Sequence, residues 1–194
     1  MHKFQDLLLL LSLTERVKNM TGTQPVIYWS IIEHGQWKLY IAKTEKGLCY
    51  IGSPGKSFEE FTAYLQKRFP SASLEKNNRL LEGHKQELTA YLNGLQQTFS
   101  LPVDVQGTPF QQQIWQALKE IPYGQTFSYS NIAEHIGRPS AVRAVATAIG
   151  ANPLLITVPC HRVIGKNGTM TGYRGGLAFK RFLLDLETQN LKEE

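Results

Sequence analysis

Val158-Pro159-Cys160-His161-Arg162-Val163-Ile164 places a cysteine directly before a histidine and an arginine. The rest of the chain is organised around this stretch. A thiol reacts as its thiolate, and neighbouring positive charges lower the cost of forming that anion. Pro159 has a fixed φ and favours an extended conformation at Val158, which predicts a rigid turn outside any helix. A free cysteine is usually a buried core residue, and we interpret Cys49 in that way. Beside proline, histidine and arginine, Cys160 is instead predicted to be a reactive thiol.

The length and composition of the chain are typical of an ordinary globular protein. The chain has 194 residues, 42% hydrophobic and 19% charged, which suits one large domain or two small ones with a proper core. Its two cysteines cannot form a disulfide framework and are typical of a reducing cytosol. We therefore predict a cytoplasmic protein. The net charge of +5 indicates, weakly, a polyanionic partner.

The charge around the cysteine turn has a single sign. A solvated surface normally mixes signs, so a run of basic residues without Asp or Glu predicts a surface that faces phosphates. Chance clustering in a mildly basic protein is the alternative, and we favour phosphate contact because the run brackets Cys160. The basic residues of this run are Arg138, Arg143, Arg162, Lys166, Arg174, Lys180 and Arg181.

The N-terminus is rich in leucine, with Leu7 to Leu11 and Leu13 in sequence. The apolar run is too short for a secretion signal and has charged residues on both sides, so we predict an N-terminal helix or extension. No run approaches the roughly 20 apolar residues of a membrane span. We expect no membrane association.

The first part of the chain, residues 1–105, is predicted to be a small α/β domain. Alternating apolar residues and turn signals predict strands at 26–32, 37–44, 47–51 and 101–105. Ser57, with Glu60 three residues later, predicts a capped helix to about residue 69, and a second helix over 84–92 should stop at Gly94. The histidines and the cysteine of this part (His2, His34, His84 and Cys49) lack the spacing of metal ligands, so we predict no metal site.

The second part, residues 106–194, is predicted to be mostly helical. Thr108 followed by Pro109 is a strong helix start, and Ser128 is predicted to cap a helix over 129–136. Ser140 is predicted to cap another over 141–149. Two short helices joined by a Gly-Arg-Pro turn are typical of a helix-turn-helix.

The second of these helices is rich in alanine, and Arg143 is its one charged side chain. Readers of the major groove carry several polar side chains on this helix. Small residues with one arginine instead favour a minor-groove contact in which the arginine enters the base stack. A buried alanine-rich helix packed on other helices is the alternative.

A last helix is expected over 177–188, burying Leu177, Phe182, Leu183 and Leu186. Glu187 lies near its end, where a carboxylate is normally exposed and without consequence.

The whole of this second part resembles the O6-alkylguanine-DNA alkyltransferases, the methylated-DNA–protein-cysteine methyltransferases. The resemblance runs from about residue 108 to 187 and includes the cysteine turn, Asn152-Pro153 upstream of it, Ser128-Tyr129, Arg143 and the loop 172–176. It implies an RNase H-like N-terminal α/β domain and a mostly α C-terminal domain with a helix-turn-helix.

The resemblance also implies the reacting groups. Cys160 looks like the alkyl acceptor, and His161 takes its proton through a water while Glu187 orients and charges the imidazole. Tyr129 is similar to the family tyrosine that supplies a proton to N3 of the leaving guanine. Asn152 resembles the residue that braces the turn.

Further residues are assigned to DNA by the same resemblance. Arg143 matches the arginine that fills the gap left by the flipped nucleotide. DNA contacts are expected from Ser128, Tyr129, Ala144, Thr147 and Arg162, and the pocket for the base from Ile149, Val163, Tyr173 and Arg174. At Arg174 some relatives carry a small residue, so this cation is expected either to assist phosphate binding or to narrow the entrance for bulky adducts.

The predicted function is repair of DNA by irreversible transfer of an alkyl group from O6 of guanine, and from O4 of thymine, to Cys160. Each molecule should act once, as a monomer on double-stranded DNA, without a cofactor. One alternative is a non-catalytic module that recognises alkylated DNA and recruits repair factors, but such relatives replace the cysteine. Another is a cysteine hydrolase using Cys160, His161 and Glu187, which leaves the helix-turn-helix and the basic run unexplained.

Overall fold

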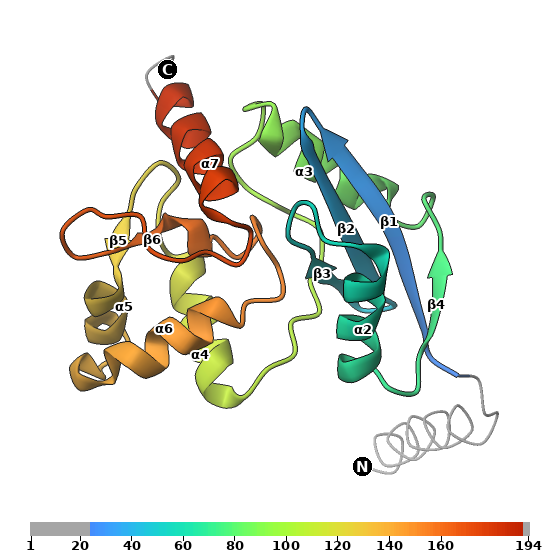
Figure 1. The fold of residues 1–194 in the computed structure, drawn as a ribbon, viewed down its shortest axis with the longest axis horizontal. Coiled ribbons are helices and arrows are strands. Elements are labelled where there is room, and N and C mark those ends of the chain that lie inside the picture. The colour runs from blue at the N-terminus through green and yellow to red at the C-terminus, as the bar shows by residue number, and fades with distance from the viewer. Residues whose placement is uncertain (1–23, 192–194) are drawn as a thin grey trace, which may run out of the picture.

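The computed structural model describes residues 24–191. The predicted Leu-rich extension and His2 lie outside the described residues. Element labels follow Figure 1.

A four-stranded sheet forms the centre of the N-terminal domain (Figure 1). Its strands lie in the order β3-β2-β1-β4, with an antiparallel meander of the first three and β4 parallel to β1. Three strands match the predicted ranges closely. The strands are β1 (Val26–His34), β2 (Trp37–Thr44), β3 (Gly47–Ile51) and β4 (Ser73–Lys76).

Helices α2 (Phe58–Arg68) and α3 (Glu82–Leu92) lie on opposite sides of the sheet (Figure 1). Side chains alternate between the faces of a strand, so the meander serves two cores. Ile27 packs in the smaller core with Phe61 of α2, whereas Ile32 belongs to the larger core with Leu88 of α3. The predicted capping box at Ser57 is confirmed.

Strand β4 was not predicted. Its sequence, Ser-Leu-Glu-Lys, shows no apolar run, and only Leu74 is shielded from solvent. Pairing with β1, over Val26 to Trp29, is what makes it a strand.

The predicted strand over 101–105 is wrong, because only Val103 forms an isolated bridge there. Pro102 interrupts a strand here because proline has no N–H to donate to a neighbouring strand. Its carbonyl still accepts a hydrogen bond from the N–H of Leu48 at 2.9 Å. The N–H of Ile51 donates in the same way to Pro153 at 2.9 Å. The outer side of β3 is therefore covered by the linker and by the segment that precedes the cysteine turn, which protects an edge strand from pairing elsewhere.

The C-terminal domain is mostly helical, as predicted (Figure 1). Thr108 and Ser128 cap their helices as predicted, and each forms a capping box with the residue three positions later. Ser140 does not, because a 3-10 turn over Pro139–Ala141 intervenes and the next helix begins without a side-chain cap. The elements are α4 (Pro109–Lys119), β5 (Phe127–Ser128), α5 (Tyr129–His135), α6 (Val142–Gly150), β6 (Val163–Ile164) and α7 (Leu177–Asn190).

Helices α5 and α6 pack on each other and on α4. Ile132 and Val145 meet Ile114 in the larger core, and the indole N–H of Trp115 donates to the carbonyl of Ala148 at 2.8 Å. This core continues without a break from the sheet of the N-terminal domain into the C-terminal helices. Among residues 24–191, no helix is long and apolar enough to cross a membrane.

The buried face of α7 differs from the prediction. Leu177 is 49% exposed, and Phe182 and Leu186 are only partly buried. The buried face instead holds Phe179, Lys180, Leu183 and Glu187, which follow one another at helical spacing. Hydropathy could not predict this face because two of its four residues are charged.

Candidate active site

Cys160 begins a 3-10 turn, Cys160–Arg162, directly after Pro159. Its side chain is 4% exposed, and its Sγ accepts a hydrogen bond from Nδ2 of Asn152 at 3.0 Å. The same amide donates to the carbonyls of Val158 and Leu154, and its Oδ1 accepts from the N–H of Leu154. Asn152 therefore braces the whole turn that carries the cysteine.

Ile156 lies in the segment that leads into the cysteine turn. Its φ of 72° is the one positive value at a non-glycine residue among those described. A β-branched residue in this conformation is strained. It is also fully buried, so packing from all sides holds the strained turn in place.

The cations that act on the thiol are not its neighbours in sequence. Burial raises the pKa of Cys160, and the hydrogen bond from Asn152 and the charges of Arg174 and Lys180 lower it in part. The adjacent His161 and Arg162, predicted to stabilise the thiolate, are not among these cations. His161 and Arg162 are next to Cys160 in sequence, but in the fold both side chains bind Glu187.

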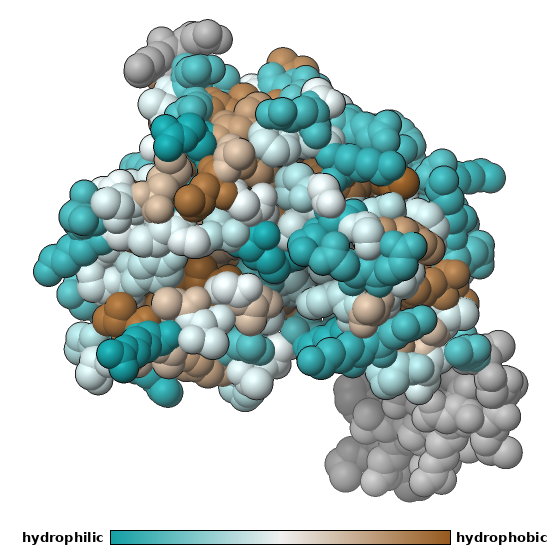
Figure 2. All heavy atoms as spheres, in the orientation of Figure 1, coloured by the Kyte–Doolittle hydropathy of each residue, from teal (hydrophilic) through white to brown (hydrophobic). Residues whose placement is uncertain are grey.

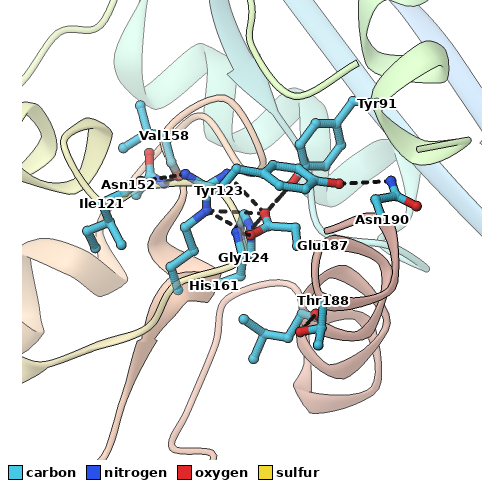
Figure 3. A network of polar contacts seen from close by, with 12 residues as sticks. Tyr91, Ile121, Tyr123, Gly124, Asn152, Val158, His161, Glu187, Thr188 and Asn190 are labelled. Atoms are coloured by element: carbon cyan, nitrogen blue, oxygen red, sulfur yellow. Dashed lines mark hydrogen bonds and ion pairs between the residues drawn. The ribbon is translucent and has the colours of Figure 1, made fainter. Parts of the chain in front are cut away.

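Glu187 is fully buried and accepts hydrogen bonds from three directions (Figure 3). Nε2 of His161 lies 2.7 Å from Oε1, and the N–H of Gly124 donates to Oε2 at 2.8 Å. Burial by itself would raise the pKa of this carboxyl, but His161 and Arg162 outweigh it and lower the pKa to about 2. Glu187 is therefore an anion across the physiological range.

The ionised carboxylate determines the tautomer of His161. A carboxylate can only accept, so Nε2 carries the proton that is donated to Glu187. In the neutral ring Nδ1 is then the basic nitrogen, and this buried atom has no protein partner within the described part of the chain. Burial lowers the pKa of His161, which keeps the imidazole neutral and able to accept a proton.

Arg162 was predicted to contact DNA, and its position rules this out. Its side chain is buried, with Nε 3.0 Å from Oε2 of Glu187 and Nη1 donating to the carbonyl of Ile121 at 2.7 Å. The guanidinium also lies over the ring of Tyr123. It fixes the carboxylate and is not available to phosphates.

Tyr91 was not identified from the sequence. It is a fully buried residue of α3, in the N-terminal domain, and its hydroxyl donates to Oε1 of Glu187. Figure 3 shows its side chain pointing into the network from the neighbouring domain. Tyr91 lies three residues after Leu88, so its spacing looked like that of any core aromatic.

Lys180 was predicted only as a member of the phosphate-facing basic run, not as a residue of the site. It is fully buried, and its Nζ donates to the carbonyls of Val163 at 2.6 Å and Thr171 at 3.2 Å. It thus joins the strand after the cysteine turn to the loop before Tyr173. In the sequence, the helical spacing of Lys180 from Leu183 and Glu187 on α7 could have indicated that all three share the buried face.

The residues predicted to form the base pocket are buried or partly buried. Val163 is fully buried, and Tyr173 is partly buried with its ring centroid 6.4 Å from that of His161. Tyr129 accepts a hydrogen bond from Oγ1 of Thr171 at 2.9 Å, which leaves its own proton available. Ile149 is buried in the helical core.

The predicted DNA contacts of α5 and α6 differ in exposure. Arg143, Ala144 and Thr147 are exposed on α6, and Thr147 donates to the carbonyl of Arg143. Ser128 is partly buried, and its hydroxyl caps α5. On the face shown in Figure 2, weakly polar residues dominate the C-terminal half, whereas hydrophilic residues gather over the N-terminal half.

Arg174 joins the two domains. Its Nη2 donates to the carbonyls of Ile51 at 2.7 Å and Pro153 at 3.2 Å, and its guanidinium lies over the ring of Tyr50. Its backbone carbonyl accepts from the hydroxyl of Ser53. These contacts engage the guanidinium between the domains, which argues against a role in phosphate binding.

The predicted phosphate-facing run is thus only partly exposed. Arg162 and Lys180 are buried, and Arg174 is engaged between the domains. The exposed members are Arg138, Arg143, Lys166 and Arg181. Within residues 24–191, no group of three or more His, Cys, Asp or Glu side chains is placed to hold a metal ion.

Known proteins match this chain over most of its length. Residues 27–105 match the ribonuclease-like domain of 6-O-methylguanine DNA methyltransferase, and residues 109–189 match its DNA-binding domain. The inducible methylated-DNA–protein-cysteine methyltransferase of Bacillus subtilis is 53% identical over 174 residues, which cover 90% of this chain and 97% of the relative.

Solved structures give the same result. The crystal structure of the Mycobacterium tuberculosis O6-methylguanine methyltransferase is similar with a TM-score of 0.74 and 37% identity, covering 84% of this chain and 94% of that one. A structure of the M. tuberculosis protein in complex with DNA has a TM-score of 0.72 and 36% identity, covering 85% and 94%. This chain belongs to the 6-O-methylguanine DNA methyltransferase family, with a ribonuclease-like N-terminal domain and a helical DNA-binding domain at its C-terminus.

Proposed function

We propose that this protein repairs double-stranded DNA directly, by moving an alkyl group from O6 of guanine, or from O4 of thymine, onto its own Cys160. The observation that carries the proposal is a buried thiol held by Asn152 next to a buried His161–Glu187 pair. This is the arrangement of nucleophile, base and orienting carboxylate.

The transfer is a displacement at the alkyl carbon. The thiol proton passes through a water to Nδ1 of His161, and Glu187 stabilises the imidazolium that forms. The S–C bond forms as the bond from carbon to O6 breaks, and Tyr129 supplies a proton to N3 so that guanine leaves neutral. The thioether product is stable, and no described group is suited to cleave it, so each molecule acts once.

DNA is bound by the C-terminal domain in this proposal. Helix α6 presents its small exposed residues to the minor groove, where Arg143 occupies the gap left by the flipped nucleotide. Ser128, Ala144 and Thr147 lie along the same pair of helices, and Ile149, Val163 and Tyr173 surround the base. Arg162 and the side chain of Arg174 take no part in DNA contact, because the fold engages both elsewhere.

All proposed reacting groups come from one chain, which is consistent with action as a monomer without a cofactor. We place the domain boundary between residues 105 and 106. A free, reduced Cys160 is required for transfer, so we place the protein in the reducing cytoplasm.

The first test is the intact mass of the protein after incubation with a short duplex that contains O6-methylguanine. We expect a gain of one methylene group, mapped to Cys160 and saturating at one per protein. No gain in mass, with tight binding to the same duplex, would instead establish a recognition module. Turnover on ester substrates would be the sign of a cysteine hydrolase.

The matched variant is Cys160→Ser. It should bind the alkylated duplex as the unaltered protein does and show no gain in mass, since a serine hydroxyl is a far weaker nucleophile than a thiolate. Loss of binding together with transfer would show that the cysteine is a structural residue.

A further inference from the structure

We propose that Tyr91 is a positioning residue for alkyl transfer, supplied by the N-terminal domain to hold Glu187 and His161 in their reactive arrangement. The inference rests on the proposed function. It gives the N-terminal domain a part in the chemistry beyond support.

The contacts of Tyr91 are specific to the reactive pair. Its hydroxyl donates to Oε1 of Glu187 and lies 3.3 Å from Nε2 of His161. The ring is held between Phe99, at a centroid distance of 5.2 Å, and Tyr123, at 5.9 Å in an edge-on arrangement. The side chain is fully buried, so water cannot replace the hydroxyl without rearrangement.

Tyr91 differs from the other groups that bind Glu187. His161, Arg162 and Gly124 all belong to the C-terminal domain, whereas Tyr91 comes from α3. Without this donor, Oε1 of Glu187 would keep only the hydrogen bonds from His161 and Arg162 of the C-terminal domain. The domain interface therefore completes the hydrogen bonding of the residue that orients the base.

The hydroxyl also sets how much negative charge His161 experiences. The titratable and charged groups around the imidazole are Glu187 and Lys180 from α7, Cys160 and Arg162 from the cysteine turn, Tyr173 from the following loop and Tyr91 from α3. A hydrogen bond to a carboxylate disperses its charge. Removal of the phenolic O–H should strengthen the attraction of Glu187 for a protonated His161 and make the histidine harder to deprotonate.

The experiment compares Tyr91→Phe with the unaltered protein in single-turnover alkyl transfer from duplex O6-methylguanine across a range of pH. The neutral form of His161 is the base, so the rate falls as pH decreases through its pKa. We call this fall in rate at low pH the acid limb. In Tyr91→Phe the midpoint of the acid limb should shift to higher pH by about one pH unit. The control is Tyr40→Phe, which removes a phenol from the smaller core of the same domain and should leave the limb in place.

An acid limb at the same pH in Tyr91→Phe and the unaltered protein would overturn the inference, even if the variant were slower or less stable. A merely structural tyrosine would produce that result. If the unaltered protein transferred no alkyl group, the proposed function itself would fail.

A second measurement does not depend on activity or on complete folding of the variant. An NMR titration of 15N-labelled histidine in the DNA-free protein reads the protonation of His161 in folded molecules, with the signal assigned through His161→Gln. The pKa of His161 should be higher in Tyr91→Phe than in the unaltered protein. Equal values would contradict the positioning role.

Discussion

Glu187 shows how much one buried residue can organise. Its two oxygens accept hydrogen bonds from Tyr91, Gly124, His161 and Arg162, which come from three separate segments of the chain. A buried charge is tolerated only when it is paired and hydrogen-bonded. The network therefore fixes the proposed base, His161, and joins the segments around it at the same time.

Glu187→Gln tests both roles. The loss of charge leaves Arg162 buried without its partner, so the free energy of unfolding should fall by about 3 kcal/mol, measured by urea denaturation. Alkyl transfer should slow by about a hundredfold or more because the imidazolium is no longer stabilised. Asp185→Asn, which removes an exposed carboxylate from the same helix, is the control and should change neither quantity appreciably.

The pKa of Glu187 predicts a pH dependence of stability. Its value in the folded protein is about 2, below the ordinary 4.5, so the unfolded chain binds the proton more readily. The stabilisation is fully present above pH 4.5 and is lost as the pH falls toward 2. Urea midpoints of the unaltered protein and of Glu187→Gln should converge over this window. A constant difference between them down to pH 2 would show that another group is responsible.

At the scale of elements, helix α6 has one buried face and one face exposed to solvent. Val145, Ala148 and Ile149 face the core, whereas Arg143, Ala144 and Thr147 are exposed. The alternative of a fully buried helix is therefore wrong for one face, because one side of α6 packs on helices and the other remains open. Small exposed residues allow a close approach to a groove, and one long cation is left to reach into it.

Arg143→Ala should weaken repair of duplex DNA by about tenfold or more, since unstacking a base costs a few kcal/mol. Reaction with free O6-alkylguanine base should change little, because no base has to be flipped. Single-turnover rates on both substrates measure the difference. Arg138→Ala removes another exposed cation near α6 and controls for net charge; equal losses on both substrates in Arg143→Ala would contradict the proposed role.

At the scale of the whole molecule, the two domains act as one body. The larger core crosses between them, and β3 pairs with backbone from the linker and from the segment before the cysteine turn. Arg174 and Tyr91 each cross the interface in opposite directions, the first to Ile51 and the second to Glu187. The geometry of the reacting groups therefore depends on how the domains meet.

Arg174→Ala should lower the free energy of unfolding by about 1–3 kcal/mol, because it leaves the carbonyls of Ile51 and Pro153 without this donor. Chemical denaturation measures the change. Arg181→Ala, which removes an exposed cation from α7, should have little effect. An unchanged stability in Arg174→Ala would mean that the domain joint depends on other contacts.

The sequence by itself determined most of the local structure and the choice of Cys160 as the proposed nucleophile. Turn residues, caps and alternation are read over a few neighbouring positions, which is why β1 to β3, α2 and α4 were predicted within a few residues. The resemblance of the cysteine turn, carried by adjacent residues, pointed to the family that the comparisons then showed.

Only the tertiary structure decided which charges act on which groups. Arg162 lies in the cysteine turn but pairs with Glu187. Arg174 and Lys180, farther along the chain, are the cations that partly offset the rise in the pKa of Cys160 caused by burial. Tyr91 lies 70 residues before His161 and reaches it across the domain interface. Burial and Coulomb energies depend on distances in space, and those distances exist only once the two domains have packed together.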